Sequence, residues 1–221
     1  MKNLALFFGG VILILVGCNS NDSKPPPENK KIPPVAALDI GRCYPYVVPK
    51  DYLQHQPDDG KGLVRPFGHG LFVLLVQDQD GLVQNVTPDD LTAAKLTAES
   101  AHEKALDNLQ KLFASGKIKA MKYDKGPHEL PFILVSEHWA SAACILLPKV
   151  RSFAQKNLGQ DEIVACIPHR DAMLLFPKPA KRELGEIRKF VVEHESEGRK
   201  PLTFEPFDLT EKGPAPVLKA P

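Results

Sequence analysis

The sequence lacks an excess of charge of either sign, and this restricts the partners that we expect. Its 221 residues include 28 Lys and Arg against 27 Asp and Glu, and no basic stripe is visible along the chain. Removing residues 1–17 takes away Lys2 and no acid, so the remainder is formally neutral. Nonspecific binding to phosphate backbones requires a basic stripe or face. We therefore expect no nucleic acid among the partners.

The motifs that identify several enzyme classes are also lacking. The chain has no HExxH zinc motif and no strand-to-helix nucleophile elbow. The His-Arg-Asp triplet at 169–171 occurs without the glycine-rich loop and Asp-Phe-Gly of a kinase. Asp78 and Asp80 occur without the rest of a twelve-residue calcium loop. The sequence therefore indicates neither a cofactor nor a metal.

The clearest signal in the sequence lies at its N-terminus. Lys2 precedes an apolar run of 13 residues, Leu4–Val16, which is shorter than the roughly 20 residues of a spanning helix. This layout is typical of a secretory signal. Gly17-Cys18 at its end resembles the lipobox of bacterial lipoproteins, whose cysteine is acylated and becomes the mature N-terminus. The alternative is an ordinary signal peptide with a chance cysteine.

A lipoprotein signal at residues 1–17 implies a lipid partner and a location. Two or three acyl chains on Cys18 would hold the protein on a membrane, where one chain would not. Asn19 follows Cys18 in place of Asp, which by similarity with lipoprotein sorting favours the outer membrane, facing the periplasm, in a Gram-negative cell. Residues 18–34 are proline-rich and favour extended polyproline II, so we interpret them as a tether.

The remaining chain predicts one α+β domain, or mixed α/β, over residues 35–209, followed by a flexible tail, 210–221. We expect a mixed sheet with a central β-α-β unit and about three helices. The apolar run at 71–76 and the turn at Asp80-Gly81 predict a hairpin over 71–86. Thr87-Pro88 predicts the start of one long helix to about Ala114, and 117–123 alternates as a strand does.

The central unit covers residues 131–177. We expect a strand at 132–135, a helix capped by Ser136 that runs to Leu158 with a kink at Pro148, and strands at 162–167 and 172–176. If the first two strands are parallel, both end on the same edge of the sheet. That edge collects several polar or aromatic side chains: Glu137, His138, Trp139, His169, Arg170 and Asp171.

Three interpretations of this edge compete. His138 and His169 with Glu137 or Asp171 are candidate zinc ligands, although their spacing matches no known motif. His169, oriented by Asp171, is a candidate base toward a hydroxyl such as that of Ser141. The third interpretation, which we favour, is structural: Arg170 and Asp171 pair locally in the turn, and His138 and Trp139 cover the edge of the sheet.

Three cysteines besides Cys18 remain in the mature chain. Cys144 and Cys166 lie in apolar segments, which favours buried small side chains over catalysts. An export compartment would also permit a disulfide between Cys144 and Cys166, with Cys43 as a rival partner. The sequence leaves both alternatives open.

Several local phrases resemble one bacterial family. The segments ALDNL at 105–109, the helix 140–148 that ends in Leu-Leu-Pro, VACIPHRD at 164–171 and Lys200-Pro201-Leu202 are similar to the YtpQ-like family of uncharacterised bacterial proteins, a domain of unknown function. The resemblance covers roughly residues 63–205. It implies a mixed α/β domain and supplies no catalytic residues.

Two functional hypotheses follow. The first is a membrane-anchored envelope domain that binds a small ligand or an envelope protein without chemistry of its own. The second is a hydrolase or a metal-dependent enzyme that uses His138, His169 and Asp171, with Glu137, Trp139 and Arg170 as binding residues. We favour the first hypothesis.

Overall fold

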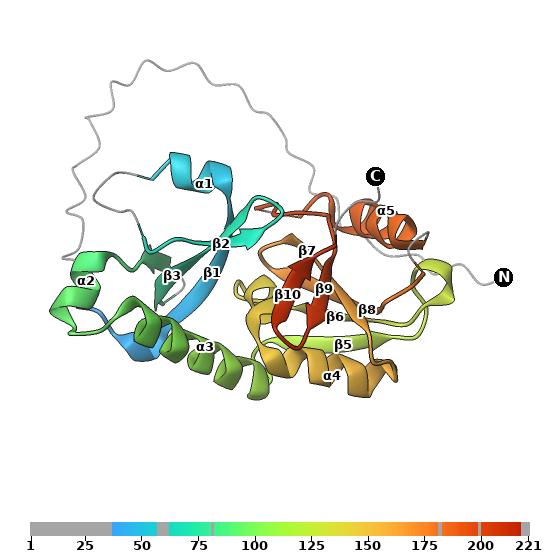
Figure 1. Ribbon diagram of the computed structural model, residues 1–221, viewed down its shortest axis with the longest axis horizontal. Coiled ribbons are helices and arrows are strands. Elements are labelled where there is room, and N and C mark those ends of the chain that lie inside the picture. The colour runs from blue at the N-terminus through green and yellow to red at the C-terminus, as the bar shows by residue number, and fades with distance from the viewer. Residues whose placement is uncertain (1–36, 57–61, 81, 181–182, 199, 218–221) are drawn as a thin grey trace, which may run out of the picture. The chain divides into compact units, whose positions relative to one another are not determined.

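The computed structural model describes residues 37–56, 62–80, 82–180, 183–198 and 200–217 (Figure 1). The expected signal peptide, Cys18 and the tether lie outside these ranges. The chain divides into Met1–Val35 and a compact unit, Ala36–Pro221, and the description below concerns the second unit alone. This unit has the α+β architecture that the sequence predicts, with helices and antiparallel sheets.

Sheet A is antiparallel and contains the expected hairpin. Its long strand β3 pairs with β1 on one side and with β2 and β4 on the other. The hairpin over 71–86 is therefore confirmed as β3 and β4. The strands are β1 (Cys43–Pro49), β2 (Arg65–Gly68), β3 (Leu71–Gln79) and β4 (Leu82–Asn85).

Sheet B follows the order β10-β9-β7-β8-β6-β5, and every recorded pair is antiparallel. The expected single mixed sheet is thus replaced by two antiparallel sheets. The strands are β5 (Lys119–Tyr123), β6 (Phe132–Ser136), β7 (Ile163–His169), β8 (Ala172–Pro177), β9 (Phe207–Thr210) and β10 (Gly213–Pro216). The last two form a hairpin, so the segment from 210 to 216 is not the flexible tail that we expected.

The central unit is a split form of the expected β-α-β unit. Strands β6 and β7 run in the same direction, but β8 lies between them and pairs antiparallel with both. The tight turn at Arg170-Asp171 explains this arrangement, because a two-residue connection forces β8 to return beside β7. Strand β6 therefore pairs with the edge of β8 that does not contact β7.

Five α-helices accompany the sheets in the described residues: α1 (Lys50–Gln54), α2 (Pro88–Ala93), α3 (Ala98–Ala114), α4 (Pro148–Leu158) and α5 (Leu184–Glu195). Short 3-10 helices lie at Ile40–Arg42, Pro127–Glu129 and Ala142–Leu146. Two expected boundaries were wrong. The long helix from Pro88 is interrupted at Lys95 (φ 56°) and restarts at Thr97, whose side chain and that of Ser100 form a second capping box.

The other incorrect boundary is the start of the central helix. It begins at Pro148, whose missing N–H costs nothing at a first helical position, and not at Glu137. Ser136 ends β6 and is no helix cap, and Glu137 has a left-handed φ of 65°. The helix ends as expected, with Gly159 in the left-handed region (φ 68°).

One apolar core joins the two sheets. Val47, Leu71 and Val73 of sheet A pack in the same buried cluster as Ile133, Leu175 and the α4 side chains. Helix α5 covers the opposite face of sheet B through Ile187 and Val191. The three cysteines at 43, 144 and 166 are buried and free, so the expected alternative of a disulfide among them is wrong. Burial raises the pKa of Cys43 and Cys166 to about 12.

His102 is a buried histidine on α3. Its side chain is 6% exposed, and Nε2 has no hydrogen-bond partner among the described residues. Burial, and to a lesser extent Arg65, lowers the pKa of His102 to about 4, whereas Glu99 opposes the shift. The folded protein therefore holds this imidazole neutral.

His102 makes stability depend on pH. Because its pKa is lower in the folded state than the usual 6.5, its contribution is complete above pH 6.5 and is lost as the pH falls toward 4. Lowering the pH to 4 should cost the folded protein roughly 3 kcal/mol of unfolding free energy through His102, and His102→Gln should remove this loss. The measurement is urea unfolding of both proteins at pH 7 and pH 4. Equal pH dependence in the two proteins would contradict this assignment.

Candidate functional site

The two joints of the split β-α-β unit meet, as the sequence predicts. The backbone N–H of Ala142 donates to the carbonyl of Arg170 at 3.1 Å, which places the segment after β6 beside the turn between β7 and β8. The candidate residues at 137–139 and 169–171 therefore belong to one region of the fold. Their side chains, however, face different partners.

His169 is directed toward helix α5. Its Nε2 lies 2.8 Å from the carboxylate of Glu195, and its Nδ1 accepts the backbone N–H of Asp171 at 3.3 Å. The proton of a neutral ring therefore lies on Nε2. A Cβ added at Gly198 would overlap the His169 ring, so this residue packs closely over it. The expectation that the Asp171 carboxylate orients His169 was wrong, because that carboxylate binds Arg170 instead.

His138 belongs to the turn that follows β6. Its Nδ1 accepts the backbone N–H of Ala140 at 3.0 Å, and its ring lies against Trp139 with centroids 5.4 Å apart. Burial lowers the pKa of His138, and the nearby carboxylates of Asp78 and Asp171 oppose this shift. Ser141 is fully buried and donates to the carbonyl of His138 at 2.7 Å. We expected Ser141 within an α-helix, but it lies just before a 3-10 helix.

These contacts favour the structural interpretation of the two histidines. Glu137 is exposed, and the structure records no contact between His138 and His169. Among the described residues, no group of three or more His, Cys, Asp or Glu side chains could hold a metal ion. The zinc alternative therefore finds no support in this region.

Arg170 and Trp139 belong to a different constellation, centred on Tyr46. Arg170 donates from Nε to Asp171 at 2.8 Å and from Nη1 to the Tyr46 hydroxyl at 3.1 Å, with its guanidinium carbon 5.9 Å from the Tyr46 ring centroid. The Tyr46 ring lies edge-on between Tyr52 and Trp139, at 6.0 and 5.9 Å. Burial alone would lower the pKa of Arg170, but Asp171 and Tyr46 outweigh it and raise the pKa.

A cleft of about 620 Å³ opens beside this constellation. We call it the Tyr46 cleft. One wall is the C-terminal half of β1 with α1, and the other is the Arg170 turn with the segment at 200–202. Its lining consists of Tyr46, Val47, Val48, Pro49, Asp51, Tyr52, His55, Gln56, Asn85, Arg170, Lys200, Pro201 and Leu202.

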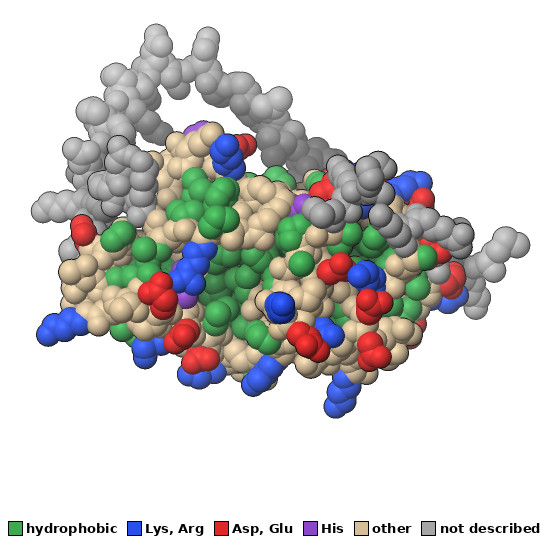
Figure 2. All heavy atoms as spheres, viewed as in Figure 1, with side chains coloured by type: hydrophobic (Ala, Val, Ile, Leu, Met, Phe, Trp, Pro, Cys, Tyr) green, Lys and Arg blue, Asp and Glu red, His purple; other side chains and the backbone are tan. Residues whose placement is uncertain are grey.

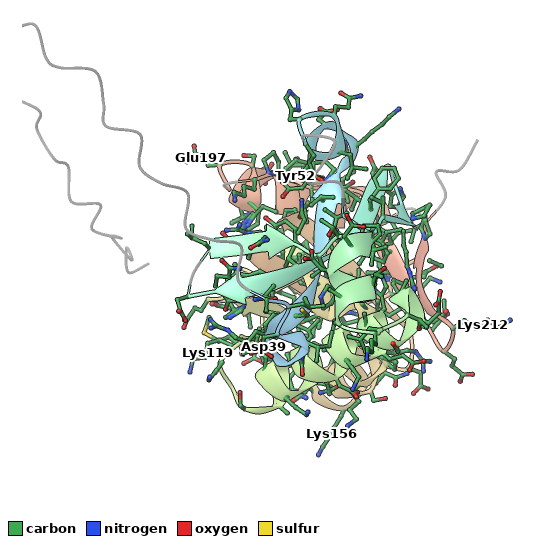
Figure 3. The ribbon with its side chains drawn as sticks, turned by 90° about the vertical axis from the view of Figure 1, so that its left-hand side faces the viewer. Asp39, Tyr52, Lys119, Lys156, Glu197 and Lys212 are labelled. Carbon is green, nitrogen blue, oxygen red and sulfur yellow. The ribbon has the colours of Figure 1, made fainter. Side chains whose placement is uncertain are left out.

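Backbone hydrogen bonds hold the second wall in place. The N–H of Leu202 donates to the carbonyl of Pro168 at 2.8 Å, and the N–H of Arg170 donates to that of Lys200 at 3.3 Å. The segment therefore continues sheet B beyond the end of β7. Figure 3 shows labelled Tyr52 and Glu197 at the same end of the molecule, with Lys156 of α4 at the opposite end.

The lining is largely apolar and aromatic, with few charges. Burial, with Tyr46 as a further cause, raises the pKa of Tyr52. The charged side chains of the lining are two cations, Arg170 and Lys200, and one carboxylate, that of Asp51. On the face shown in Figure 2, by contrast, acidic and basic side chains are interspersed with apolar ones.

Sequence analysis missed several residues of the cleft. It located Arg170 but not Tyr46, Tyr52 or Lys200. The run Tyr44–Val48 favours an extended segment, although nothing in it shows which face would meet Arg170. Helix α1 has only five residues and lies in a segment, 50–62, whose composition favours a loop.

Comparison with known proteins gives no family: no family model, curated protein or solved structure matches this chain significantly. The resemblance to the YtpQ-like family stays a prediction. Over the part of the chain that the structure describes, no helix is long and apolar enough to cross a membrane. The cleft itself is therefore the main guide to function.

The packing of Gly198 on His169 can be tested by a double-mutant cycle. We expect Gly198→Ala to cost about 1–3 kcal/mol of unfolding free energy, because its methyl group overlaps the imidazole. In a His169→Ala background the same change should cost much less. The measurement is urea unfolding of the four proteins. Gly185→Ala is the control, since nothing lies within 4 Å of its added Cβ; an equal cost in both backgrounds would refute the contact.

Proposed function

We propose that this chain is a lipid-anchored protein of the bacterial envelope whose folded unit binds a small ligand in the Tyr46 cleft. The observation that carries the binding proposal is the cleft of about 620 Å³, walled by aromatic and aliphatic side chains with a guanidinium at one side. Small-molecule sites typically have about 300–1,000 Å³ and this mixture of apolar walls and few polar groups.

The charges of the cleft favour an anionic group on the ligand. Arg170 is held by Asp171 through Nε and by Tyr46 through Nη1, and its Nη2 makes no hydrogen bond among the described residues. A guanidinium fixed in this way is pre-organised to donate to a carboxylate or a similar anion. Lys200 adds a second positive charge to the same cleft.

The same region supports binding better than hydrolysis. Both ring nitrogens of His169 already have partners, and the buried Ser141 hydroxyl is committed to a backbone carbonyl. A base and nucleophile pair would need hydrogen-bond reach between the two side chains. We therefore do not carry the hydrolase hypothesis further.

The anionic dye 1-anilinonaphthalene-8-sulfonate and its uncharged analogue N-phenyl-1-naphthylamine provide a matched test. We expect both dyes to fluoresce with the folded unit, residues 36–221. Arg170→Gln should weaken binding of the anionic dye about tenfold, because a charge-assisted hydrogen bond is lost, and should leave the neutral dye unaffected. The measurement is a fluorescence titration with each dye.

The control for this titration is Arg42→Gln, which removes an arginine that is also paired with an aspartate but lies outside the cleft. Circular dichroism melting must show that all variants remain folded. If Arg170→Gln and Arg42→Gln bind the anionic dye equally, the cleft is not an anion-binding site and the proposal fails.

The lipid anchor is tested separately, in a Gram-negative host. We expect the full chain to incorporate labelled palmitate and to fractionate with the outer membrane, because Leu15-Val16-Gly17-Cys18 resembles a lipobox and Asn19 follows it. Cys18→Ser should lose the label. Asn19→Asp should keep the label but move to the inner membrane. Palmitate labelling of Cys18→Ser would contradict the assignment.

A further inference from the structure

Strand β1 is an edge strand, and its free edge borders the Tyr46 cleft. Among the described strands it pairs with β3 alone. An edge strand turns every second residue's N–H and C=O away from the sheet. The question is which residues of β1 do so.

Two hydrogen bonds settle the direction of the backbone groups. The carbonyl of Leu75, opposite Pro45, accepts the N–H of Val86 at 2.9 Å, on the side of β3 away from β1. Leu75 therefore exchanges no bonds with Pro45, and alternation directs the groups of residues 43, 45, 47 and 49 outward. The side-chain amide of Asn108, which donates to the carbonyl of Cys43 at 3.1 Å from outside the sheet, agrees with this direction.

Val47 is 3% exposed, borders the cleft, and is the residue of this edge whose outward backbone donor and acceptor have no recorded partner among the described residues. Cys43 has its carbonyl covered by Asn108, and Pro45 and Pro49 carry no N–H. Val47 retains both a donor and an acceptor, lines the cleft, and makes no backbone hydrogen bond beyond the β1–β3 ladder among the described residues. Prolines on an edge strand prevent long strands from adding to it.

We propose that the ligand of the Tyr46 cleft is a short extended peptide with a free C-terminal carboxylate. This inference rests on the proposed binding function and names its ligand class. One residue of the peptide exchanges both backbone hydrogen bonds with Val47, as a strand added to a sheet edge does. The carboxylate is held by Arg170 and Lys200 at the opposite wall.

The flanking prolines set the length of this peptide. Pro45 and Pro49 are four residues apart, which corresponds to about 13 Å along a strand. Their rings occupy the positions where a longer strand would need N–H donors. A segment of about three residues therefore fits, and it agrees with the limited volume of the cleft.

The direction of the Val47 amide can be tested without a ligand. Val47→Pro removes an outward N–H and a core side chain, whereas Val48→Pro removes a core side chain and an N–H that faces β3. We expect both to lower the melting temperature, and Val48→Pro to lower it much further. In the unmodified protein, amide exchange of Val47 should be faster than that of Tyr46 and Val48. Slow exchange at Val47 in the free protein would overturn the proposal.

The ligand class is tested with randomised acetyl-tripeptide mixtures. We expect the free-acid mixture to raise the melting temperature of the folded unit and to slow exchange at Val47, with the bound peptides identified by mass spectrometry. A C-terminally amidated mixture should not raise the melting temperature, because it lacks the carboxylate that Arg170 would bind. An N-methylated mixture, or Val47→Pro, should weaken binding about three- to tenfold through the lost hydrogen bonds.

The outcomes separate this inference from the proposed function. If the anionic dye binds through Arg170 but no tripeptide mixture does, the cleft is a site and the peptide inference is wrong. Equal binding of the free-acid, amidated and N-methylated mixtures also overturns it. If neither dye nor peptide binds, the proposed function fails as well.

Discussion

The double pairing of β8 determines where the polar joints of this fold meet. Because β8 pairs antiparallel with both β6 and β7, those two strands point the same way and end at the same edge of the sheet, on either side of β8. The turn after β6 and the turn after β7 are then joined by the hydrogen bond from Ala142 to Arg170.

Arg170 links the two sheets at the cleft. It extends from the β7–β8 turn of sheet B, where Asp171 holds it, to the hydroxyl of Tyr46 on sheet A. The apolar core contains residues of both sheets and so stabilises the same arrangement. A cleft at such a junction combines rigid walls with a fixed charge, and this combination favours selective binding.

The sequence predicted the class of fold and several local elements because their signals are local. Thr87-Pro88 and Gly159 mark helix ends through their own backbone chemistry, and the Asp80-Gly81 pair in the sequence predicted the 71–86 hairpin. The sequence did not show that β8 inserts between β6 and β7, since strand order depends on long-range packing. It missed the restart at Thr97, although the Thr97-Ser100 capping pair was a readable signal.

For the candidate site, too, the sequence predicted which segments would meet but not which side chains would pair. Proximity of the segments at 137–139 and 169–171 followed from the shared direction of β6 and β7, which the sequence indicated correctly, and not from the order of the strands. The partners of the side chains did not follow, because Glu195 at the end of α5 and Gly198 just after that helix reach His169 from a distant part of the sequence. Tyr46 likewise reaches Arg170 across 124 positions of sequence.

The central claim is that the Tyr46 cleft is the ligand site of this unit. The most direct measurement is the map of backbone amide chemical shifts in isotope-labelled residues 36–221 during titration with the anionic dye. We expect the largest changes at the non-proline residues of 46–52, at 170, and at 200 and 202. Changes centred on the surface of α5, or on the turn between α4 and β7, would contradict it.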